Sequence, residues 1–234
     1  MNLYITLDTT ATYIMHTKEL SFYPETMNIA GKEVVKYWLE WARHQGYKKL
    51  YINTMRIGMD NEKIQMLQDL YGIEVIYQTS LNQTDITIEK EEYDGMGIFL
   101  DSGEYRRFKS LDEVLMFEQE LIYHPLSYCS LVGYGKSEHI HVGKNVYIHK
   151  SAKLSGAVII GDNCIIEKDV EIKDSVINND CLIKERSIVE NSHIGQNIHM
   201  TTNLYLKDKA LFESSIYDRT KKVSVIHEGI CSTS

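Results

Sequence analysis

Residues 142–171, VGKNVYIHKSAKLSGAVIIGDNCIIEKDVE, decide the fold of the C-terminal half of this chain. An aliphatic residue recurs every six positions, at 142, 148, 154, 160, 166 and 172, and the repeat continues in five- and six-residue steps to residue 216. The fifth position of each unit is small or β-branched, as at Val146, Ala152, Val158, Cys164, Val170, Val176, Cys181 and Ser187. Two inward positions per unit do not fit the period of an α-helix and predict a short strand followed by a turn. Three such units would close one coil of about 18 residues.

This pattern resembles the hexapeptide repeat of the left-handed parallel β-helix, over residues 140–219. The resemblance implies a scaffold of stacked aliphatic ladders, with residues 220–234 as a tail that caps its open end. Some proteins of this type are acyl- or acetyltransferases that use a catalytic histidine. The candidates are His141, His149, His193 and His199, of which His193 falls at an inward small-residue position and the others at coil edges. Because no long insertion interrupts the repeat, acyl transfer is an alternative only.

The cysteines test the predicted stacking. Cys164 and Cys181 occupy equivalent positions three units apart, so the repeat places them on one face of adjacent coils, about 5 Å apart at the backbone. The chain has four cysteines and no CxxC pair, which argues against a metal cluster or a disulfide framework. We expect reduced thiols.

The residues before Pro125 follow another pattern, in which strand-like and helix-like segments alternate. The strand-like runs are residues 3–7, 49–53, 73–77 and 97–100, and the helical ones are residues 32–44, 61–71 and 111–123. This alternation predicts a mostly parallel α/β sheet over residues 1–125, joined to the repeat by a linker at 126–139. Ligands bind such sheets at the carboxyl ends of the strands, so we expect any site in the loops after Leu7, Asn53 and Leu100.

Residues 24–53, PETMNIAGKEVVKYWLEWARHQGYKKLYIN, resemble the segment of sugar-phosphate nucleotidyltransferases that runs PKxxxxIxGKPxL and continues into a helix, a glycine and a strand. Those enzymes frequently carry a C-terminal left-handed β-helix, so the two resemblances agree. The α/β part here is far shorter than the catalytic domain of that family. The resemblance implies a nucleotide or sugar phosphate as ligand, and magnesium as cofactor if the chain is active.

The same resemblance implies a set of ligand-binding residues: Asp8, Thr9, Thr10, Glu25, Gly31, Lys32 and Asp101. Pro24, Ile29, Gly31 and Lys32 fall on the conserved letters of the family segment. Asp101, in IFLDSG, corresponds either to the metal-binding aspartate of the family or to its later DIG segment, and the sequence does not decide between them. We take it as the candidate metal ligand.

Two departures from the family pattern bear on catalysis. Glu25 stands where the family has a lysine that neutralises phosphate charge, and a carboxylate there would repel phosphates. The family loop LAAGxGTRL corresponds to TLDTTATYI, residues 6–14, which has no glycine to let the backbone approach phosphate and no arginine. We therefore expect impaired nucleotidyl transfer.

Charge and composition limit the remaining classes. The net charge of −8 disfavours nucleic-acid binding. The sequence contains no run of 18 apolar residues and therefore predicts no membrane span, so we expect a cytoplasmic protein. Our leading hypothesis is a catalytically impaired nucleotidyltransferase-like protein of sugar-nucleotide or surface-polysaccharide metabolism, which binds a ligand, a partner protein or a second copy of itself. A second hypothesis is an active enzyme with a rebuilt site, and a third is a purely structural oligomerisation protein.

Overall fold

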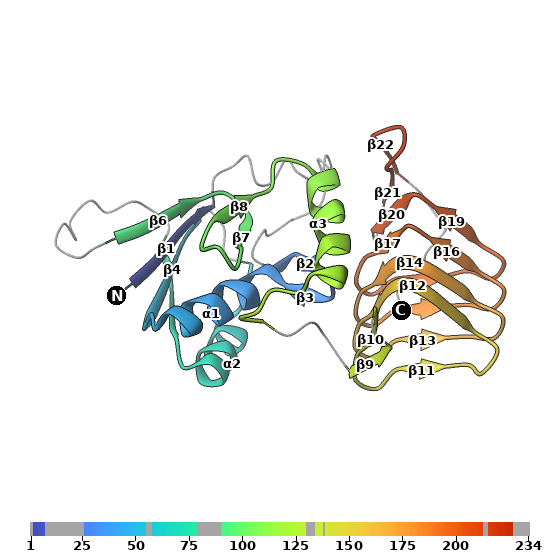
Figure 1. Ribbon diagram of the computed structural model, residues 1–234, viewed down its shortest axis with the longest axis horizontal. Coiled ribbons are helices and arrows are strands. Elements are labelled where there is room, and N and C mark those ends of the chain that lie inside the picture. The colour runs from blue at the N-terminus through green and yellow to red at the C-terminus, as the bar shows by residue number, and fades with distance from the viewer. Residues whose placement is uncertain are drawn as a thin grey trace. The chain divides into compact units, whose positions relative to one another are not determined.

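The structure, a computed structural model, describes residues 2–7, 26–54, 58–78, 90–129, 134–137, 139–212 and 215–226. The chain divides into two compact units. Unit 1 comprises residues 1–27, 32–114 and 126–130, and unit 2 comprises residues 28–31, 115–125 and 131–234. Parallel strands dominate the sheets of both units, and helices are few (Figure 1).

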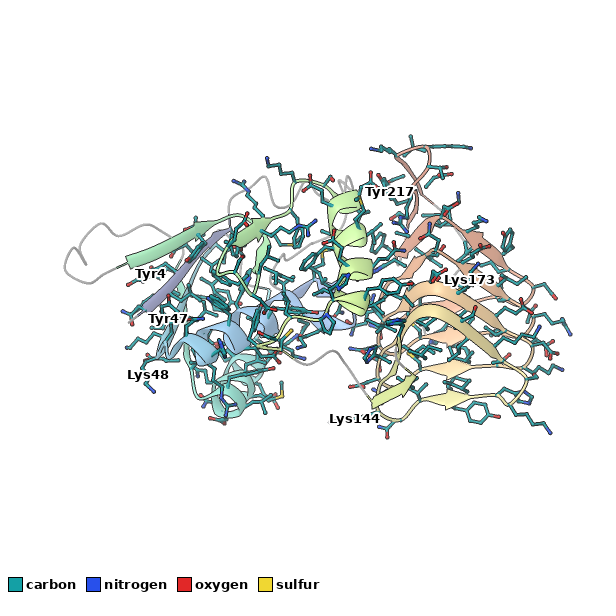
Figure 2. The ribbon with its side chains drawn as sticks, in the orientation of Figure 1. Tyr4, Tyr47, Lys48, Lys144, Lys173 and Tyr217 are labelled. Atoms are coloured by element: carbon teal, nitrogen blue, oxygen red, sulfur yellow. The ribbon has the colours of Figure 1, made fainter. Side chains whose placement is uncertain are left out.

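Unit 1 is built on a four-stranded sheet with the order β5-β4-β1-β6, in which every pairing is parallel. Its strands are β1 (Asn2–Leu7), β4 (Lys49–Thr54), β5 (Glu74–Gln78) and β6 (Lys90–Asp94). Leu3, Ile5 and Leu7 are buried on one face. On the other face, Tyr4 (labelled in Figure 2) stacks on Tyr51 with ring centroids 4.4 Å apart. The predicted parallel sheet is confirmed. The sequence pattern does not predict β6, because KEEYD contains no apolar run.

The described helices are α1 (Val34–Gln45), α2 (Asn61–Tyr71) and α3 (Leu111–Tyr123). α1 buries an apolar stripe, and the indole Nε1 of Trp38 in that stripe donates to the Gly97 carbonyl oxygen at 2.8 Å. α1 and α2 end at Gly46 and Gly72, whose φ angles of 80° and 69° suit a residue without a Cβ. The first turn of α3 belongs to unit 1 and the remainder to unit 2.

The strand expected at residues 97–100 does not join the parallel sheet. β7 (Gly97–Phe99) instead pairs antiparallel with β8 (Tyr105–Arg107). Residues 100–104 can reverse the chain but are too few for the crossover connection that a parallel pair needs. The prediction that this apolar run forms a strand is therefore confirmed, and the prediction that the strand belongs to the parallel sheet is wrong.

The C-terminal half forms stacked parallel strands, which we name the β-stack (β10 to β20, residues 140–212; Figure 1). The strands are β10 (Ile140–Val142), β11 (Tyr147–Ile148), β12 (Lys153–Ile160), β13 (Ile165–Ile166), β14 (Glu171–Ile177), β15 (Leu182–Ile183), β16 (Ile188–Glu190), β17 (His193–Ile194), β18 (His199–Met200), β19 (Tyr205–Lys207) and β20 (Lys209–Phe212). Equivalent residues on adjacent coils are 17 or 18 positions apart, close to the coil length that the repeat predicts.

The interior of the β-stack is aliphatic, and the two cysteines lie in it as the repeat predicts. Ile165 N donates to the Cys181 carbonyl oxygen at 2.8 Å, so Cys164 and Cys181 are neighbours on adjacent coils. The Cys164 thiol donates to the Asn178 carbonyl oxygen and the Cys181 thiol to that of Gly195, each at 3.0 Å. The hydrogen bond with Cys164 and burial raise the pKa of Cys181, which suits a structural thiol.

Left-handed residues turn the corners of the coils. Their φ angles are between 46° and 59°, and the residues are Asn145, Asn163, Asp169, Asp174, Asp180, Arg186, Asn191, Asn197, Asn203 and Asp208. Asparagine and aspartate adopt this conformation more readily than other residues with a Cβ, which explains their recurrence at the polar positions of the repeat. Their side chains also join adjacent coils: Asn163 Nδ2 donates to Asp180 Oδ1 at 2.9 Å.

Two residues expected in the interior face the opposite way. The sequence pattern places Val176 and His193 inward, but the register pairs Val158, a core residue, with Ser175, and it pairs Val176 with His193. Ser175 therefore points inward, and Val176 and His193 point outward. The repeat units that end at these two residues have five residues instead of six, and a one-residue change of register moves a side chain to the other face.

Antiparallel strands adjoin both ends of the β-stack. β9 (Tyr134–Ser137), within the segment expected to be a linker, pairs with β10. β21 (Ser215–Asp218) turns back on β20, and β22 (Val223–Ile226) pairs with β21, so the parallel repeat ends before residue 219. β22 lies within the tail expected at residues 220–234. No helix in the described part of the chain is long and apolar enough to cross a membrane.

Candidate functional site

The carboxyl ends of β1 and β4 are adjacent, at the edge where parallel sheets bind ligands. Asn53 Nδ2 donates to Thr6 Oγ1 at 3.0 Å, and Asn53 is 6% exposed. Its Oδ1 atom is buried without a hydrogen-bond partner in the described structure, so it is an unused acceptor at this edge. Four residues assigned by the resemblance lie outside the described residues: Asp8, Thr9, Thr10 and Glu25.

Gly31 and Lys32, also assigned by the resemblance, lie between α1 and the short strand β2 (Asn28–Ile29). Gly31 is in a turn with a φ of 77°, and Lys32 begins β3 (Lys32–Glu33). Lys32 is 7% exposed, and its Nζ atom lies 2.7 Å from Glu40 Oε2 and 4.8 Å from the centroid of the Tyr37 ring. The ammonium charge is thus paired with a carboxylate of α1.

Glu40 is also close to two groups with raised pKa values. Burial and then the Glu40 carboxylate raise the pKa of Tyr71 to about 12. Burial raises the pKa of Cys129 to about 12 as well, with Lys32 opposing this effect and Glu40 adding to it. Both groups keep their protons at neutral pH, and both hydrogen-bond to Glu40. This cluster therefore holds an ion pair and two donors, and it presents no thiolate nucleophile.

Asp101, the candidate metal ligand, is an exposed residue in the turn after β7. Its carboxylate accepts from Ser127 N at 2.9 and 3.1 Å and from Ser127 Oγ at 2.8 Å. No group of three or more potential metal ligands occurs among the described residues. Asp101 fastens the segment after α3 to the β7–β8 hairpin, and its role toward a metal remains a prediction.

Unit 2 contains a buried polar network of Glu118 on α3, His193 on β17 and Asn178 at a corner of the β-stack. The residues are 1%, 3% and 1% exposed. Glu118 Oε2 lies 2.7 Å from His193 Nδ1, and Glu118 Oε1 accepts from Ala30 N at 2.8 Å. His193 Nε2 lies 3.1 Å from Asn178 Nδ2, which also donates to the Ile194 carbonyl oxygen at 2.9 Å.

The hydrogen bonds assign the roles of the atoms in this network. Because the Asn178 amide nitrogen only donates, His193 Nε2 accepts, and Nδ1 carries the proton that is donated to Glu118. This assignment follows from the orientation of the Asn178 amide. Asn178 Oδ1 is buried and has no partner within the described structure. Both ring nitrogens of His193 are occupied and enclosed, so this imidazole is not placed to act as a base on an external substrate.

The other candidate histidines lie in different settings. Burial, with a smaller effect of His139, lowers the pKa of His141. His149 Nδ1 lies 2.9 Å from Ser151 Oγ, and His199 is on β18. Among the described contacts, none of these three histidines is paired with a carboxylate as His193 is with Glu118. The sequence pattern indicates His193 as a candidate but predicts that its side chain points inward, whereas it points outward. It does not identify Glu118 or Asn178.

Comparison with known proteins finds a relative for the C-terminal half. Residues 137–231 match the family model described as GMPPB C-terminal domain, which is a domain of a sugar nucleotidyltransferase. This match covers less than half of the chain. No curated protein sequence matches the chain.

Two solved structures are similar at a low level. The acetyltransferase domain of PglB from Neisseria gonorrhoeae FA1090 is 13% identical over 88% of this chain and 76% of that one, with a TM-score of 0.20. The same domain in complex with acetyl coenzyme A is 10% identical over 88% and 75%, with a TM-score of 0.19. At these TM-scores neither likeness bears on fold or activity. The family match alone relates this chain, through its C-terminal half, to sugar nucleotidyltransferases.

Proposed function

We propose that this chain is a nucleotidyltransferase-like protein of sugar-nucleotide or surface-polysaccharide metabolism in the cytoplasm. Unit 1 binds a nucleotide or sugar phosphate at the carboxyl edge of its parallel sheet and transfers nucleotidyl groups poorly or not at all. The β-stack is a left-handed β-helix that serves assembly with a partner enzyme or with a second copy. The C-terminal family match and the parallel sheet support the relationship.

The Lys32–Glu40 ion pair carries the argument for impaired catalysis. Lys32 is the basic residue of the GK pair in the nucleotidyltransferase-like segment, and its charge is matched at 2.7 Å by a carboxylate of the same unit. A cation that is already paired offers less stabilisation to the developing charge of a phosphoryl transition state. The sequence around it adds Glu25 in place of a lysine and a loop without glycine or arginine.

The size of these losses favours binding over turnover. Removing one preorganised charged or oxyanion-type contact typically costs about 2.7–4 kcal/mol, which is roughly 100- to 1,000-fold in rate. Three contacts are altered here, and losses of this kind do not add simply but act in the same direction. Ground-state binding depends less on these groups than the transition state does, so a ligand site survives their loss.

Thermal unfolding of the full chain tests the binding half of the proposal. Nucleoside triphosphates, nucleotide sugars and sugar 1-phosphates are each added with magnesium, and a ligand at a hundredfold excess over its Kd should stabilise the protein by about 2.7 kcal/mol. Asn53→Ala should reduce this ligand-induced shift, because it removes the unused acceptor at the sheet edge. Tyr205→Ala, at an exposed position of the β-stack, is the control and should leave the shift unchanged. The absence of a shift with every ligand would remove the binding proposal.

Pyrophosphate release tests the catalytic half. A nucleoside triphosphate and a sugar 1-phosphate are incubated with the protein and magnesium, and we expect release no faster than in the protein-free control. Release at an enzymatic rate with any pair of substrates would replace our proposal with that of an active enzyme that has a rebuilt site.

A further inference from the structure

The outward side of the sheet β11-β13-β15-β18 carries two in-register rows of side chains. Ile148, Ile166, Ile183 and Met200 point into the interior, so the residues before and after each of them point outward. The first row is Tyr147, Ile165, Leu182 and His199, and the second is His149, Glu167, Lys184 and Thr201. We name these two rows the ladder face.

The first row is mostly apolar, and two of its residues are exposed. Tyr147 is 57% exposed and Ile165 is 44% exposed. Another outward row of the β-stack contains Ile159, Val176, His193 and Ala210 and is likewise mostly apolar, but its residues are at most 3% exposed because other parts of unit 2 cover them. The ladder face has the composition of a covered face and lacks a cover among the described residues.

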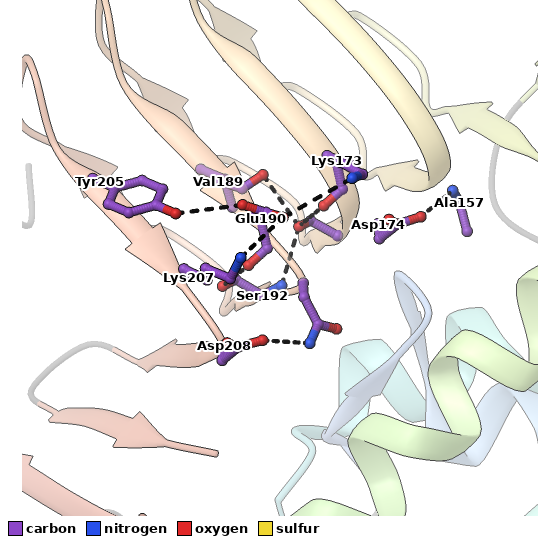
Figure 3. Close-up of polar contacts among 11 residues, drawn as sticks. Ala157, Lys173, Asp174, Val189, Glu190, Ser192, Tyr205, Lys207 and Asp208 are labelled. Atoms are coloured by element: carbon purple, nitrogen blue, oxygen red, sulfur yellow. Dashed lines mark hydrogen bonds and ion pairs between the residues drawn. The ribbon is translucent and has the colours of Figure 1, made fainter. Parts of the chain in front are cut away.

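The second row carries unpaired charges of opposite sign. Glu167 and Lys184 lie on adjacent coils, and neither forms an ion pair with another described residue; Glu167 accepts only the N–H of Glu185. On the neighbouring face, by contrast, Glu190 lies 3.2 Å from Lys207 and 4.0 Å from Lys173 (Figure 3). Charges that pair within one face are typical of a solvated surface, whereas those of the ladder face remain available to a partner.

The ladder face is complementary to itself. A two-fold axis that lies in the contact plane, parallel to the strands, reverses the order of the coils and keeps each row opposite its own copy. Ile165 then faces Leu182 of the second copy, and Glu167 faces Lys184 of the second copy. The two central apolar residues meet each other, Tyr147 faces His199 of the second copy, and no like charges are opposed.

The other face-to-face two-fold arrangement is unfavourable. An axis parallel to the stacking direction keeps the order of the coils and exchanges the two rows. Ile165 would then face Glu167, and Leu182 would face Lys184, so each charge would be desolvated against an apolar side chain. The charge pattern therefore selects the antiparallel arrangement of the two stacks.

We propose that the ladder face is the contact surface of a two-fold dimer in which two β-stacks pack antiparallel. The face spans four strands about 4.8 Å apart, which is smaller than a standard protein interface, so the dimer is weak and depends on concentration. This surface specifies the self-association named in the proposed function and does not depend on nucleotide binding by unit 1.

Sedimentation velocity of the full chain, from about 1 to 300 μM, tests the dimer in the micromolar range expected of a small interface. The wild-type chain should shift from monomer to dimer as its concentration rises. Glu167→Lys and Lys184→Glu each oppose like charges across the contact, so each should raise the dissociation constant by about tenfold or more. The double variant Glu167→Lys/Lys184→Glu restores the complementarity and should recover the wild-type behaviour.

Glu171→Lys makes the same charge change on the neighbouring face and is the matched control, with no expected effect on the dissociation constant. Far-ultraviolet circular dichroism verifies that each variant is folded. A wild-type chain that remains monomeric over the whole range overturns the proposal. So does a double variant that stays monomeric although folded, or a control that weakens the dimer as strongly as Glu167→Lys.

Discussion

The contact between Glu118 and His193 should behave as a strongly coupled pair in a double-mutant cycle. Both side chains are almost completely buried in unit 2, so water cannot replace a partner that is removed. The variants are Glu118→Leu, His193→Leu and the combination of the two. Leucine removes the polar atoms and retains an apolar side chain in the site.

The magnitude follows from the atoms that each variant leaves without a partner. Glu118→Leu leaves the N–H of Ala30 and the Nδ1–H of His193 unpaired, at about 1–3 kcal/mol each. His193→Leu leaves the Glu118 carboxylate buried with one donor fewer, which costs about 3–5 kcal/mol. The combined variant contains neither the unpaired Nδ1–H nor the unpaired carboxylate. Its destabilisation should therefore fall short of the sum of the single effects by at least about 2 kcal/mol.

Urea unfolding followed by circular dichroism measures the four free energies of unfolding. Glu120→Leu makes the same substitution at an exposed position of the same helix, and it should destabilise the chain much less than Glu118→Leu does. Additive effects of the two network substitutions, within about 0.5 kcal/mol, would refute the reasoning, because they would mean that the two side chains do not share a buried hydrogen bond.

Three further predictions concern single residues. Gly156→Ala should lower the melting temperature, because Gly156 has a φ of 69° and an added Cβ would lie 2.0 Å from Asp174 Oδ1. The decrease in melting temperature should be smaller when Asp174, shown in Figure 3, is also replaced by alanine. Lys32→Met should lower the urea midpoint by the equivalent of about 3 kcal/mol, since it leaves Glu40 unpaired, and adding Glu40→Leu should restore part of it. Above pH 9 the unfolded chain loses the Cys129 proton while the folded chain keeps it to about pH 12, so stability should fall as the pH rises. Cys129→Ala should make this decline, measured as urea midpoints from pH 8 to 10.5, less steep; an unchanged slope would contradict the assignment.

The sequence predicts most of the backbone architecture because its signals are local. Buried aliphatic residues at fixed steps indicate the strands of the β-stack, and polar residues between them indicate the corners. The same local signal identifies β7 as a strand but contains nothing about its partner, which depends on the short connection to β8. β6 has no apolar run and becomes a strand only through pairing with β1.

The candidate sites are less predictable because they depend on register and on contacts between distant segments. His193 follows a five-residue unit, and counting that unit as six residues points the side chain to the wrong side of the strand. Glu118 reads as a solvent-exposed residue in a charged helix. One signal was available: Glu118 falls between Val114, Leu115, Leu121 and Ile122 on the apolar face of α3, and a carboxylate in such a stripe requires a buried partner.

The cost of the buried network suggests what it contributes. Replacement of both partners of a buried hydrogen bond by apolar residues of similar shape is often neutral or stabilising, so stability alone does not account for Glu118 and His193. The outward residues around His193, Val176 and Ala210, are apolar, and contacts of that kind tolerate small displacements along the strand. The carboxylate of Glu118, by contrast, must meet both Ala30 N–H and His193 Nδ1–H within hydrogen-bond distance. Only one position of α3 on the β-stack allows the carboxylate to accept from both donors. The network therefore fixes the position of α3, whereas the apolar contacts stabilise its packing.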